Sequence, residues 1–435
     1  MKFVCFLVTV VAVATAASIT AQLAGTQKVC YDNYSVFKLN IRNTTELALE
    51  ILYTLKTYKN FFFTYMQFDI WKEYDAVEQN VHIMVGPDEI KYFKNFMKSH
   101  EFNVELLIPN VQELIDAEQQ VSQRSDSIAF GWTRYYQLYE IETWLDDILV
   151  TYPQVTEGFS IGQSYEGRTI RGIKISYKTG NPGIFVESNI HAREWITSAT
   201  ATWYINELLT SEKPEIRTLA ENNDWYIIPV FNVDGFAYTH ERDRMWRKTR
   251  QPVLNSPCIG ADANRNFDSH WMANDGASSD PCDSFYAGSA PFSEPETQAL
   301  AAYVANIKDK INIYLAFHSY GQFLLSPYGH STTEFPENYD HVLSIGRAFS
   351  DAISGLSYGT KYTYGSFGTV LYVGSGTSVD YAYSTQNIKL GFTIEYRDKG
   401  RFGFILPPVQ ILPNCEELMT GMLALVSKSK ELGYL

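Results

Sequence analysis

The sequence predicts an α/β protein in which a mixed, largely parallel sheet carries helices on both faces, preceded by a smaller α+β unit. Two observations support this fold class. Apolar runs of strand length alternate with helical segments over residues 125–435, which is typical of a buried, largely parallel sheet. The residues before position 124 instead follow the order strand, helix, strand, strand, helix, strand, which predicts an open antiparallel sandwich.

The smaller unit is expected to span residues 18–124. Its predicted helices are Thr45–Tyr58, whose leucine and isoleucine side chains recur on one side, and a second helix that begins at Pro87 and ends near Ser99. Its predicted strands are short runs rich in apolar and aromatic residues. They are Tyr34–Ile41, Met66–Trp71, Asn80–Val85 and Phe102–Ile108.

The larger unit, residues 125–435, repeats the alternation of strand and helix. One helix is predicted to begin at a capping-box sequence, Ser293-Glu-Pro-Glu296, and to end at Ile307. The other predicted helices are Tyr135–Thr151, a segment that ends near Ser211, Tyr339–Ile353 and Cys415–Lys428. The predicted strands are Val155–Ile161, Ile170–Ser176, Gly183–Ile190, Trp225–Pro229, Ile311–His318 and Leu390–Glu395.

The first residues predict a secretory signal over residues 1–17. Met1-Lys2 is followed by the apolar run Phe3–Ala14 and by small residues, which is the pattern of a signal peptide. The apolar run is too short to cross a bilayer, and no later run is long enough to do so. We therefore expect a secreted, extracellular and monomeric protein with no membrane anchor.

The formal charge of −14 argues against nucleic-acid binding, because that function needs basic patches. An acidic balance is otherwise expected of a solvated surface. Asn33 and Asn43 each begin an N-glycosylation sequence.

A polar stretch, Glu118–Ser127, lies where the two predicted units meet. It lacks apolar periodicity, so we expect an exposed linker. The stretch holds a single arginine, Arg124, at which a trypsin-like protease would cut the chain. An ordinary linker that contains an arginine is the alternative.

Five cysteines are present, and one of them lies in the signal segment. Cys258 and Cys282 bracket a loop rich in Gly, Asn, Asp and Ser, and in an oxidising compartment they are the natural disulfide pair. Cys30 and Cys415 remain, and they either pair with each other or stay free.

The run His191-Ala-Arg-Glu194 follows the apolar strand Gly183–Ile190 and predicts two ligands of one metal ion. His318 ends another predicted strand and would be the third ligand. Imidazole nitrogen and carboxylate oxygen are ordinary Zn²⁺ ligands, and a catalytic zinc keeps three protein ligands. We expect the ligand atoms to lie within about 4 Å of one another. An exposed histidine beside a surface glutamate is the alternative for the short motif alone.

Glu395 ends a third predicted strand, as His318 does. In sheets of this kind, ligands bind outside the carboxyl ends of the strands. The placement supports a site shared by these strand ends.

Several other motifs complete a recognisable set. They are Gly162-Gln-Ser-Tyr-Glu-Gly-Arg168, Asp262-Ala-Asn-Arg-Asn266, Ser326-Pro-Tyr-Gly329 and Gly400-Arg-Phe-Gly-Phe404. With the metal ligands, the chain resembles the secreted zinc carboxypeptidases of the carboxypeptidase A/B type over nearly its whole length. The resemblance implies the mixed eight-stranded sheet of that family over residues 125–435, one Zn²⁺ per chain, and an activation pro-domain over residues 18–124.

The resemblance also assigns the residues that bind substrate. A C-terminal exopeptidase must recognise a free carboxylate, and the planar fork of an arginine can bond both of its oxygens. That role falls to Arg265, helped by Asn264 and by Tyr372. Arg193 and Arg244 are expected along the path of the substrate.

For catalysis, the resemblance implies roles for Glu395 and Arg247. Zinc lowers the pKa of a water molecule toward 7 and polarises the scissile carbonyl. Glu395 would take the proton of the water and deliver it to the leaving amine. Arg247 would stabilise the oxyanion. The alternative for Glu395 is a strand-end carboxylate paired with Arg397.

The pocket for the C-terminal side chain is expected to decide specificity. B-type enzymes of the family carry an aspartate at the pocket floor, and the matching residue here is Val379. The other matching wall positions are uncharged, namely Leu325, Gly329, Leu371, Gly374 and Thr393. An unpaired buried ammonium costs several kcal/mol, so we expect apolar or aromatic C-terminal residues to be preferred. Phe367 lies where it narrows or floors the pocket, which leaves the preferred size open.

Two other functions match parts of the sequence. One is B-type cleavage of basic C-terminal residues, which Val379 argues against. The other is an inactive secreted binding homologue. Such a protein would have lost a metal ligand or the base, whereas this chain keeps them all.

The resemblance implies that the pro-domain covers the cleft and that a trypsin-like protease releases it at Arg124. Peptide and protein C-termini are the expected substrates. The family also carries non-proline cis peptides near its site, and they match the bonds Ser319-Tyr320, Pro327-Tyr328 and Arg397-Asp398.

Overall fold

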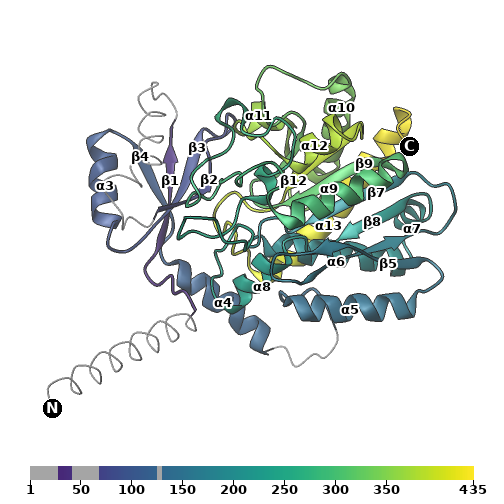
Figure 1. Cartoon of the computed structure of the whole chain (residues 1–435), viewed down its shortest axis with the longest axis horizontal. Coiled ribbons are helices and arrows are strands. Elements are labelled where there is room, and N and C mark those ends of the chain that lie inside the picture. The colour runs from purple at the N-terminus through teal and green to yellow at the C-terminus, as the bar shows by residue number, and fades with distance from the viewer. Residues whose placement is uncertain (1–27, 42–67, 125–129) are drawn as a thin grey trace, which may run out of the picture.

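The computed structural model describes residues 28–41, 68–124 and 130–435, which form two units lying side by side (Figure 1). The N-terminal unit ends at residue 124, and the C-terminal unit comprises residues 130–435. Several predicted features lie outside the described residues. They are the signal segment, the helix Thr45–Tyr58, the glycosylation sequence at Asn43 and the residues directly after Arg124.

The N-terminal unit contains a four-stranded antiparallel sheet in the order β2-β3-β1-β4. Its strands are β1 Ser35–Asn40, β2 Phe68–Lys72, β3 Asn80–Val85 and β4 Asn103–Ile108. Helix α3, Ile90–Ser99, buries Phe93 and Met97 against this sheet, where Phe93 contacts Phe37 of β1. These elements confirm the predicted small α+β unit.

The end of the N-terminal unit differs from the prediction of an exposed linker that begins at Glu118. Residues Val111–Arg124 form helix α4. Val111 and Ile115 are buried, and Glu118 is buried on the same side of the helix. Apolar periodicity does not predict this helix, because a carboxylate occupies one of its inward positions.

The C-terminal unit is built on an eight-stranded mixed sheet in the order β11-β10-β12-β9-β7-β8-β6-β5. Its central strands, β12, β9, β7 and β8, are parallel neighbours, and antiparallel pairs join β10 to β12, β8 to β6 and β6 to β5. The strands are β5 Thr156–Gln163, β6 Thr169–Ile175, β7 Gly183–Ser188, β8 Asp224–Ile228, β9 Ile311–His318, β10 Phe323–Ser326, β11 Thr363–Ser366 and β12 Leu390–Glu395. The predicted fold class is confirmed. Strands β10 and β11 are not predicted, because so few residues show no period.

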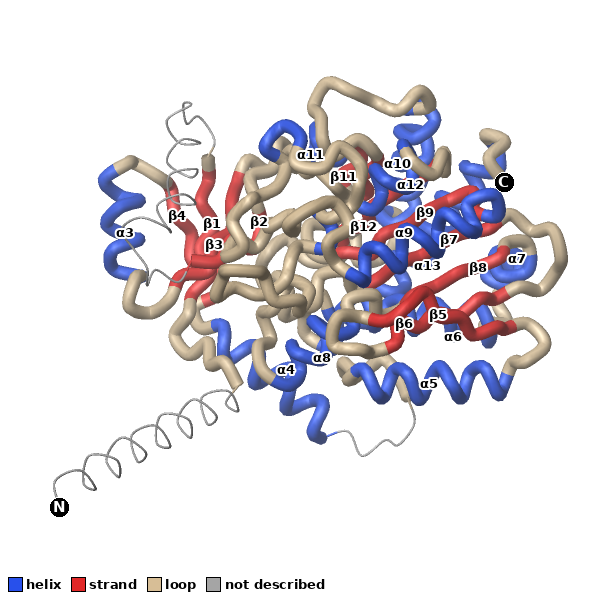
Figure 2. Tube along the Cα trace, in the orientation of Figure 1, coloured by secondary structure: helices blue, strands red, loops and turns tan. Residues whose placement is uncertain are grey.

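Helices cover both faces of the sheet (Figure 2). Neighbouring residues of a strand point to opposite faces. On one face, Trp225 of β8 packs on Tyr204 of α6, Trp195–Thr210. On the other face, Phe185 of β7 contacts Tyr303 of α9, Pro295–Ile307. The remaining helices are α5 Leu138–Thr151, α7 Pro214–Glu221, α8 Val233–Glu241, α10 Tyr339–Ser354, α11 Phe367–Val370, α12 Ser378–Ser384 and α13 Ile411–Glu431. Helices α7, α8, α11 and α12 are not predicted.

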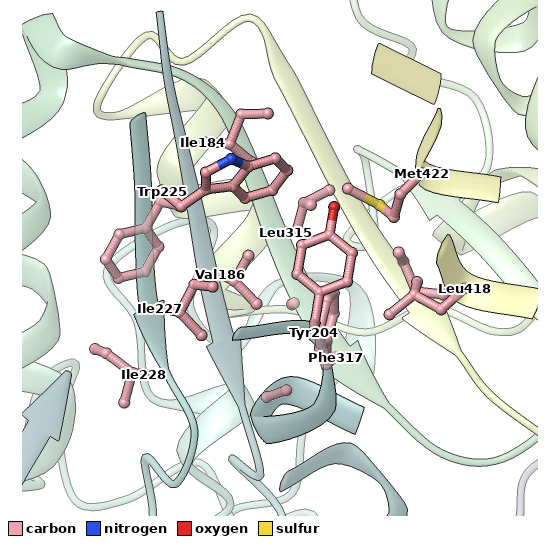
Figure 3. Close-up of a cluster of buried hydrophobic side chains, with 14 of the residues drawn as sticks. Ile184, Val186, Tyr204, Trp225, Ile227, Ile228, Leu315, Phe317, Leu418 and Met422 are labelled. Atoms are coloured by element: carbon pink, nitrogen blue, oxygen red, sulfur yellow. The ribbon is translucent and has the colours of Figure 1, made fainter. Parts of the chain in front are cut away.

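The layer between the sheet and helices α6 and α13 forms a close-packed apolar core (Figure 3). It contains Ile184 and Val186 of β7, Trp225 and Ile227 of β8, Leu315 and Phe317 of β9, Tyr204 of α6, and Leu418 and Met422 of α13. Each of these side chains is at most 1% exposed. Burying an aliphatic or aromatic side chain contributes about 1.5–3 kcal/mol, so this core fixes the central strands and their ends.

The predictions of a disulfide and of three cis peptide bonds are confirmed. Cys258 and Cys282 form a disulfide with their Cα atoms 5.2 Å apart. Of the other described cysteines, Cys30 is exposed, Cys415 is buried, and neither is bonded to another cysteine. The bonds Ser319-Tyr320, Pro327-Tyr328 and Arg397-Asp398 are all cis.

Within residues 28–41, 68–124 and 130–435, no helix has the length and apolar character that a membrane crossing requires.

Candidate active site

The predicted metal ligands lie at the carboxyl ends of two neighbouring strands. Strand β7 ends at Ser188, and the turn that follows carries His191 and then Glu194, directly before helix α6 begins. Strand β9 ends with His318. Because Ser188 of β7 is paired in parallel with Phe317 of β9, both strand ends reach the same edge of the sheet. All three ligand residues are buried.

The three ligand side chains converge on one point. His191 Nδ1 lies 2.8 Å from Glu194 Oε1, and His318 Nδ1 lies 3.2 Å from Glu194 Oε2. One ligand atom from each residue lies within 4.8 Å of the others, somewhat wider than the expected distance of about 4 Å. Two imidazoles and one carboxylate are a donor set of catalytic zinc sites. The set therefore fits Zn²⁺, and it is the only such group among the described residues.

Asp262 is a residue of this site to which the sequence analysis gives no role. His191 Nε2 donates to Asp262 Oδ1 at 3.1 Å, and Arg247 Nη2 donates to Asp262 Oδ2 at 2.7 Å. A carboxylate on the far nitrogen of a ligand histidine fixes the orientation of the ring. Asp262 lies two residues before Asn264, and that shared motif is the signal that could have found it.

The charges of the site favour the metal-binding forms of Glu194 and His191, whereas burial is outweighed at His318 by Glu194, which raises the pKa of that imidazole. Burial opposes ionisation of Glu194, but His191 and His318 outweigh it, so the pKa of Glu194 is held below its usual range. Burial, followed by the nearby Arg247, lowers the pKa of His191. An ionised carboxylate and a neutral imidazole are the metal-binding forms of these groups.

Glu395 ends strand β12 directly beside His318, its partner in the sheet register. It lines the same cavity as the metal ligands. Burial raises the pKa of Glu395 to about 8. The alternative partner Arg397 is engaged elsewhere, because its Nε donates to Glu417 at 2.8 Å.

Arg265, Asn264 and Tyr372 come together next to the metal ligands. Arg265 Nη2 donates to the Tyr372 hydroxyl at 3.1 Å, and Asn264 Nδ2 lies 3.4 Å from His318 Nε2. The backbone N–H of Ser378 donates to Asn264 Oδ1 at 3.0 Å and so orients the amide. The geometry places a buried guanidinium, suited to a carboxylate, beside the metal site.

The N-terminal unit covers this cavity. Residues Ile70, Trp71, Lys72 and Glu73, from β2 and the chain directly after it, line the cavity together with the metal ligands. The Trp71 ring packs against the Phe404 ring of the C-terminal unit, with their centroids 5.4 Å apart. The approach to the metal ligands is therefore closed from this side.

Three ion pairs among the described residues join the N-terminal unit, which covers the cleft, to the C-terminal unit, and one of them is Lys399 Nζ with Glu78 Oε1 at 2.8 Å. Arg193 Nη1 donates to Asp69 Oδ2 at 2.6 Å. Arg244 donates to both carboxylate oxygens of Glu118, at 2.7 and 3.1 Å. Both arginines are predicted to lie along the path of the substrate, and the N-terminal unit engages both. Arg124, the predicted cleavage point, is the last residue of α4.

Most positions expected to form the specificity pocket do not line the cavity beside the metal ligands: Phe367 and Leu371 do, whereas Val379, Leu325, Gly329, Gly374 and Thr393 are not among the described residues that line it. Val379, at the start of α12, is 4% exposed and packs close to Gly391 of β12. The Phe367 side chain therefore bounds the cavity on this side.

The chain was compared with known families and proteins. Residues 141–421 match the zinc carboxypeptidase family, and residues 39–118 match the carboxypeptidase activation peptide. A zinc carboxypeptidase from Simulium vittatum is 49% identical over 302 residues, which cover 69% of this chain and 98% of that protein. Carboxypeptidase B from Rattus norvegicus is 37% identical over 363 residues, which cover 82% of this chain and 86% of that protein.

A crystal structure of carboxypeptidase A from Helicoverpa armigera matches with a TM-score of 0.82 and 27% sequence identity, covering 94% of this chain and 100% of that chain. Relatives named for both the A and the B type are thus similar to this chain. The chain belongs to the zinc carboxypeptidase family, as a metallocarboxypeptidase with an activation peptide and a zinc site formed by His191, Glu194 and His318.

Proposed function

We propose that this chain is the secreted zymogen of an A-type carboxypeptidase, which removes apolar C-terminal residues from peptides and proteins. In this proposal residues 1–17 are the signal, residues 18–124 are the activation pro-domain and residues 125–435 are the catalytic domain. The observation that supports the A-type assignment is the identity of Val379, an uncharged residue at the sequence position where B-type enzymes of the family have an aspartate.

Arg265 anchors the substrate in this proposal. Its guanidinium binds the terminal carboxylate of the peptide, with help from Asn264 and from the Tyr372 hydroxyl that it already contacts at 3.1 Å. Arg193 and Arg244 contact the preceding residues of the peptide once the N-terminal unit has left. The scissile carbonyl is thereby positioned at the zinc ligands.

Glu395 and Arg247 carry the proton transfer and the charge stabilisation. Bound zinc would polarise the carbonyl and lower the pKa of a water molecule toward 7. Glu395 accepts the proton of the attacking water and delivers it to the nitrogen of the leaving amino acid. Arg247, held by Asp262 at 2.7 Å, donates to the oxyanion that develops on the carbonyl oxygen.

The N-terminal unit blocks the substrate in the precursor. A tethered cover acts at a high effective concentration, so it inhibits with a modest interface. A trypsin-like protease that cuts after Arg124 removes the tether. The mature enzyme then acts as a monomer outside the cell.

Specificity is tested with peptides that differ only in the last residue. After trypsin activation we expect kcat/KM to be higher for peptides ending in leucine than for peptides ending in lysine or arginine. Val379→Asp is expected to raise the lysine-to-leucine ratio by at least about tenfold, because a buried carboxylate supplies the missing partner. Val379→Asn, of similar size and neutral, is the matched control and should not. A wild-type preference for lysine or arginine would overturn the A-type assignment.

A further inference from the structure

The side chain of Phe367 lies where the cavity beside the metal ligands ends. Phe367 is the first residue of the short helix α11 and is 7% exposed. It belongs to an apolar cluster with Phe323, Leu325 and Val370, against which Tyr372 packs. Phe367 itself lines the cavity that contains the metal ligands. Phe367 therefore belongs both to the lining of the cavity and to a packed apolar cluster.

Two glycines show where the ring of Phe367 lies. A Cβ atom added to Gly374 would lie 2.9 Å from Phe367 Cε1 and 3.4 Å from the Arg265 Cζ. A Cβ atom added to Gly329 would lie 3.4 Å from Phe367 Cδ1. The ring thus lies against both glycines, on the side of Gly374 that faces the guanidinium of Arg265.

The position of Arg265 determines where the last side chain of a substrate must go. The α-carbon of that residue carries the carboxylate, which binds Arg265, and the nitrogen of the scissile bond, which lies toward the metal ligands. We infer that its side chain takes a third direction, toward Phe367, which lines the cavity and lies next to Gly374 beside the Arg265 guanidinium. The Phe367 ring therefore meets the substrate side chain first, before Val379, which does not line the cavity among the described residues.

The backbone holds the Phe367 ring in this place. The N–H of Gly368 donates to the carbonyl of Tyr328 at 3.0 Å, and the N–H of Gly374 donates to the carbonyl of Gly329 at 2.9 Å. A Cβ atom on Gly368 would come within 2.2 Å of the Ser331 carbonyl oxygen, so the two segments are in close contact. The segment cannot move outward to clear the pocket without breaking these contacts.

We propose that Phe367 shortens the specificity pocket and restricts the enzyme to small aliphatic C-terminal residues. Alanine, valine and leucine fit in front of the ring, whereas phenylalanine, tyrosine and tryptophan need the volume that the ring occupies. The proposal rests on the A-type function above and narrows its substrate class. It makes Phe367 a specificity-determining residue of this chain.

The test compares the trypsin-activated wild type with Phe367→Ala on peptides that differ only in a terminal leucine, tryptophan or lysine. The wild type should favour leucine over tryptophan by at least about tenfold in kcat/KM, and Phe367→Ala should shift that ratio toward tryptophan by at least about tenfold, since pocket volume discriminates by such factors. Binding of 3-phenylpropanoate relative to 4-methylpentanoate, measured by calorimetry, should shift in the same direction.

Val370→Ala is the matched control, because Val370 belongs to the same cluster and does not line the cavity among the described residues. It should leave the leucine-to-tryptophan ratio unchanged. If Phe367→Ala does not fold, Phe367→Leu should shift the ratio in the same direction to a smaller extent. A wild-type preference for tryptophan over leucine, or an unchanged ratio in a folded Phe367 variant, overturns the role of Phe367 and leaves the A-type proposal standing. A wild-type preference for lysine overturns the A-type proposal itself.

Discussion

Different interactions hold the two sides of the catalytic cleft. One side, the floor, consists of the strand ends that carry the site, and the other, the cover, is the N-terminal unit. The floor consists of strand ends whose positions are set by a sheet register and by a core in which the central side chains are at most 1% exposed. The cover is held by side-chain ion pairs, among them Asp69 with Arg193 and Glu118 with Arg244, and by aromatic contacts such as that of Trp71. The metal ligands thus lie at the strand ends of the sheet of the C-terminal unit, whereas the N-terminal unit contacts that site through side chains.

The residues that bind the N-terminal unit also explain why this unit must dissociate before a peptide can bind. Arg193 and Arg244 are 2% and 4% exposed in the covered cleft. A peptide cannot reach them while Asp69 and Glu118 occupy them. The same guanidinium groups that the proposal assigns to substrate binding therefore serve as the docking points of the activation peptide.

The largest predicted loss of activity follows from a change at Glu395, on the floor of the cleft. In the trypsin-activated enzyme, Glu395→Gln should lower kcat/KM by about 10³-fold, because a neutral amide cannot accept the proton from water. The metal content and the thermal unfolding temperature should stay near wild-type values, since the sheet register does not depend on this charge. Glu334→Gln, an exposed position of the same unit, is the control. Retained activity in Glu395→Gln would remove Glu395 from the mechanism.

The next effect concerns the ion pair between Glu118 and Arg244. Glu118→Ala leaves Arg244 buried without its carboxylate, which costs about 3 kcal/mol and should weaken binding of the cut cover by about 100-fold. The measurement is the activity of trypsin-cut precursor on serial dilution, where the concentration for half-maximal activity rises with the dissociation constant. Glu113→Ala, on the exposed side of α4, should not change it. Equal curves for both variants would show that the pair does not hold the cover.

Acid should loosen the cover through His82. This residue of β3 is buried at the interface, and its Nδ1 lies 2.9 Å from the Tyr320 hydroxyl. Burial, followed by the positive charge of Lys72, lowers the pKa of His82 to about 3. Lys38 also lowers this pKa, whereas the negative charge of Glu78 raises it. The covered state thus disfavours the protonated ring. Its stabilisation is complete above the ordinary pKa of about 6.5 and is lost as the pH falls.

This pH dependence is measured by serial dilution of the trypsin-cut precursor at pH 7.5 and at pH 5.0. If His82 returns to its ordinary pKa on release, protonation at pH 5.0 should weaken binding of the cut cover by about 30-fold. His82→Asn keeps a polar group near Tyr320 but does not titrate, so it should lose that part of the pH dependence. The same pH dependence in both proteins would assign the effect to other groups.

The smallest predicted effect is on the rate of activation by trypsin and follows from a change at Arg124. Arg124→Gln should slow activation of the precursor by trypsin by at least about tenfold, because the proposed cleavage point is removed. Gln123→Ala, which keeps Arg124, should be activated at the wild-type rate. The time course is followed by gel electrophoresis and by peptide hydrolysis. Unchanged activation of Arg124→Gln would move the cleavage point elsewhere.

The sequence predicts the site more completely than it predicts the cover. His191, Glu194, His318 and Glu395 are of the residue types that bind zinc or transfer protons, and they lie at the ends of apolar runs. Both signals can be read within a few residues of the chain. Helix α4 gives no such signal, because Glu118 occupies an inward position that apolar periodicity would assign to a hydrophobic residue.

The features that can be predicted from the sequence are therefore local. They are the strand and helix periods, the chemistry of the ligands, the disulfide pair and the motifs of the family. Contacts between residues far apart in the chain become visible only once the fold is known. Asp262 contacts His191, Glu118 contacts Arg244, and the Phe367 ring lies against Gly329 and Gly374. The physical reason is that a period or a ligand type belongs to a short segment, whereas the burial of a charge or the filling of a pocket depends on partners that the fold brings from elsewhere in the chain.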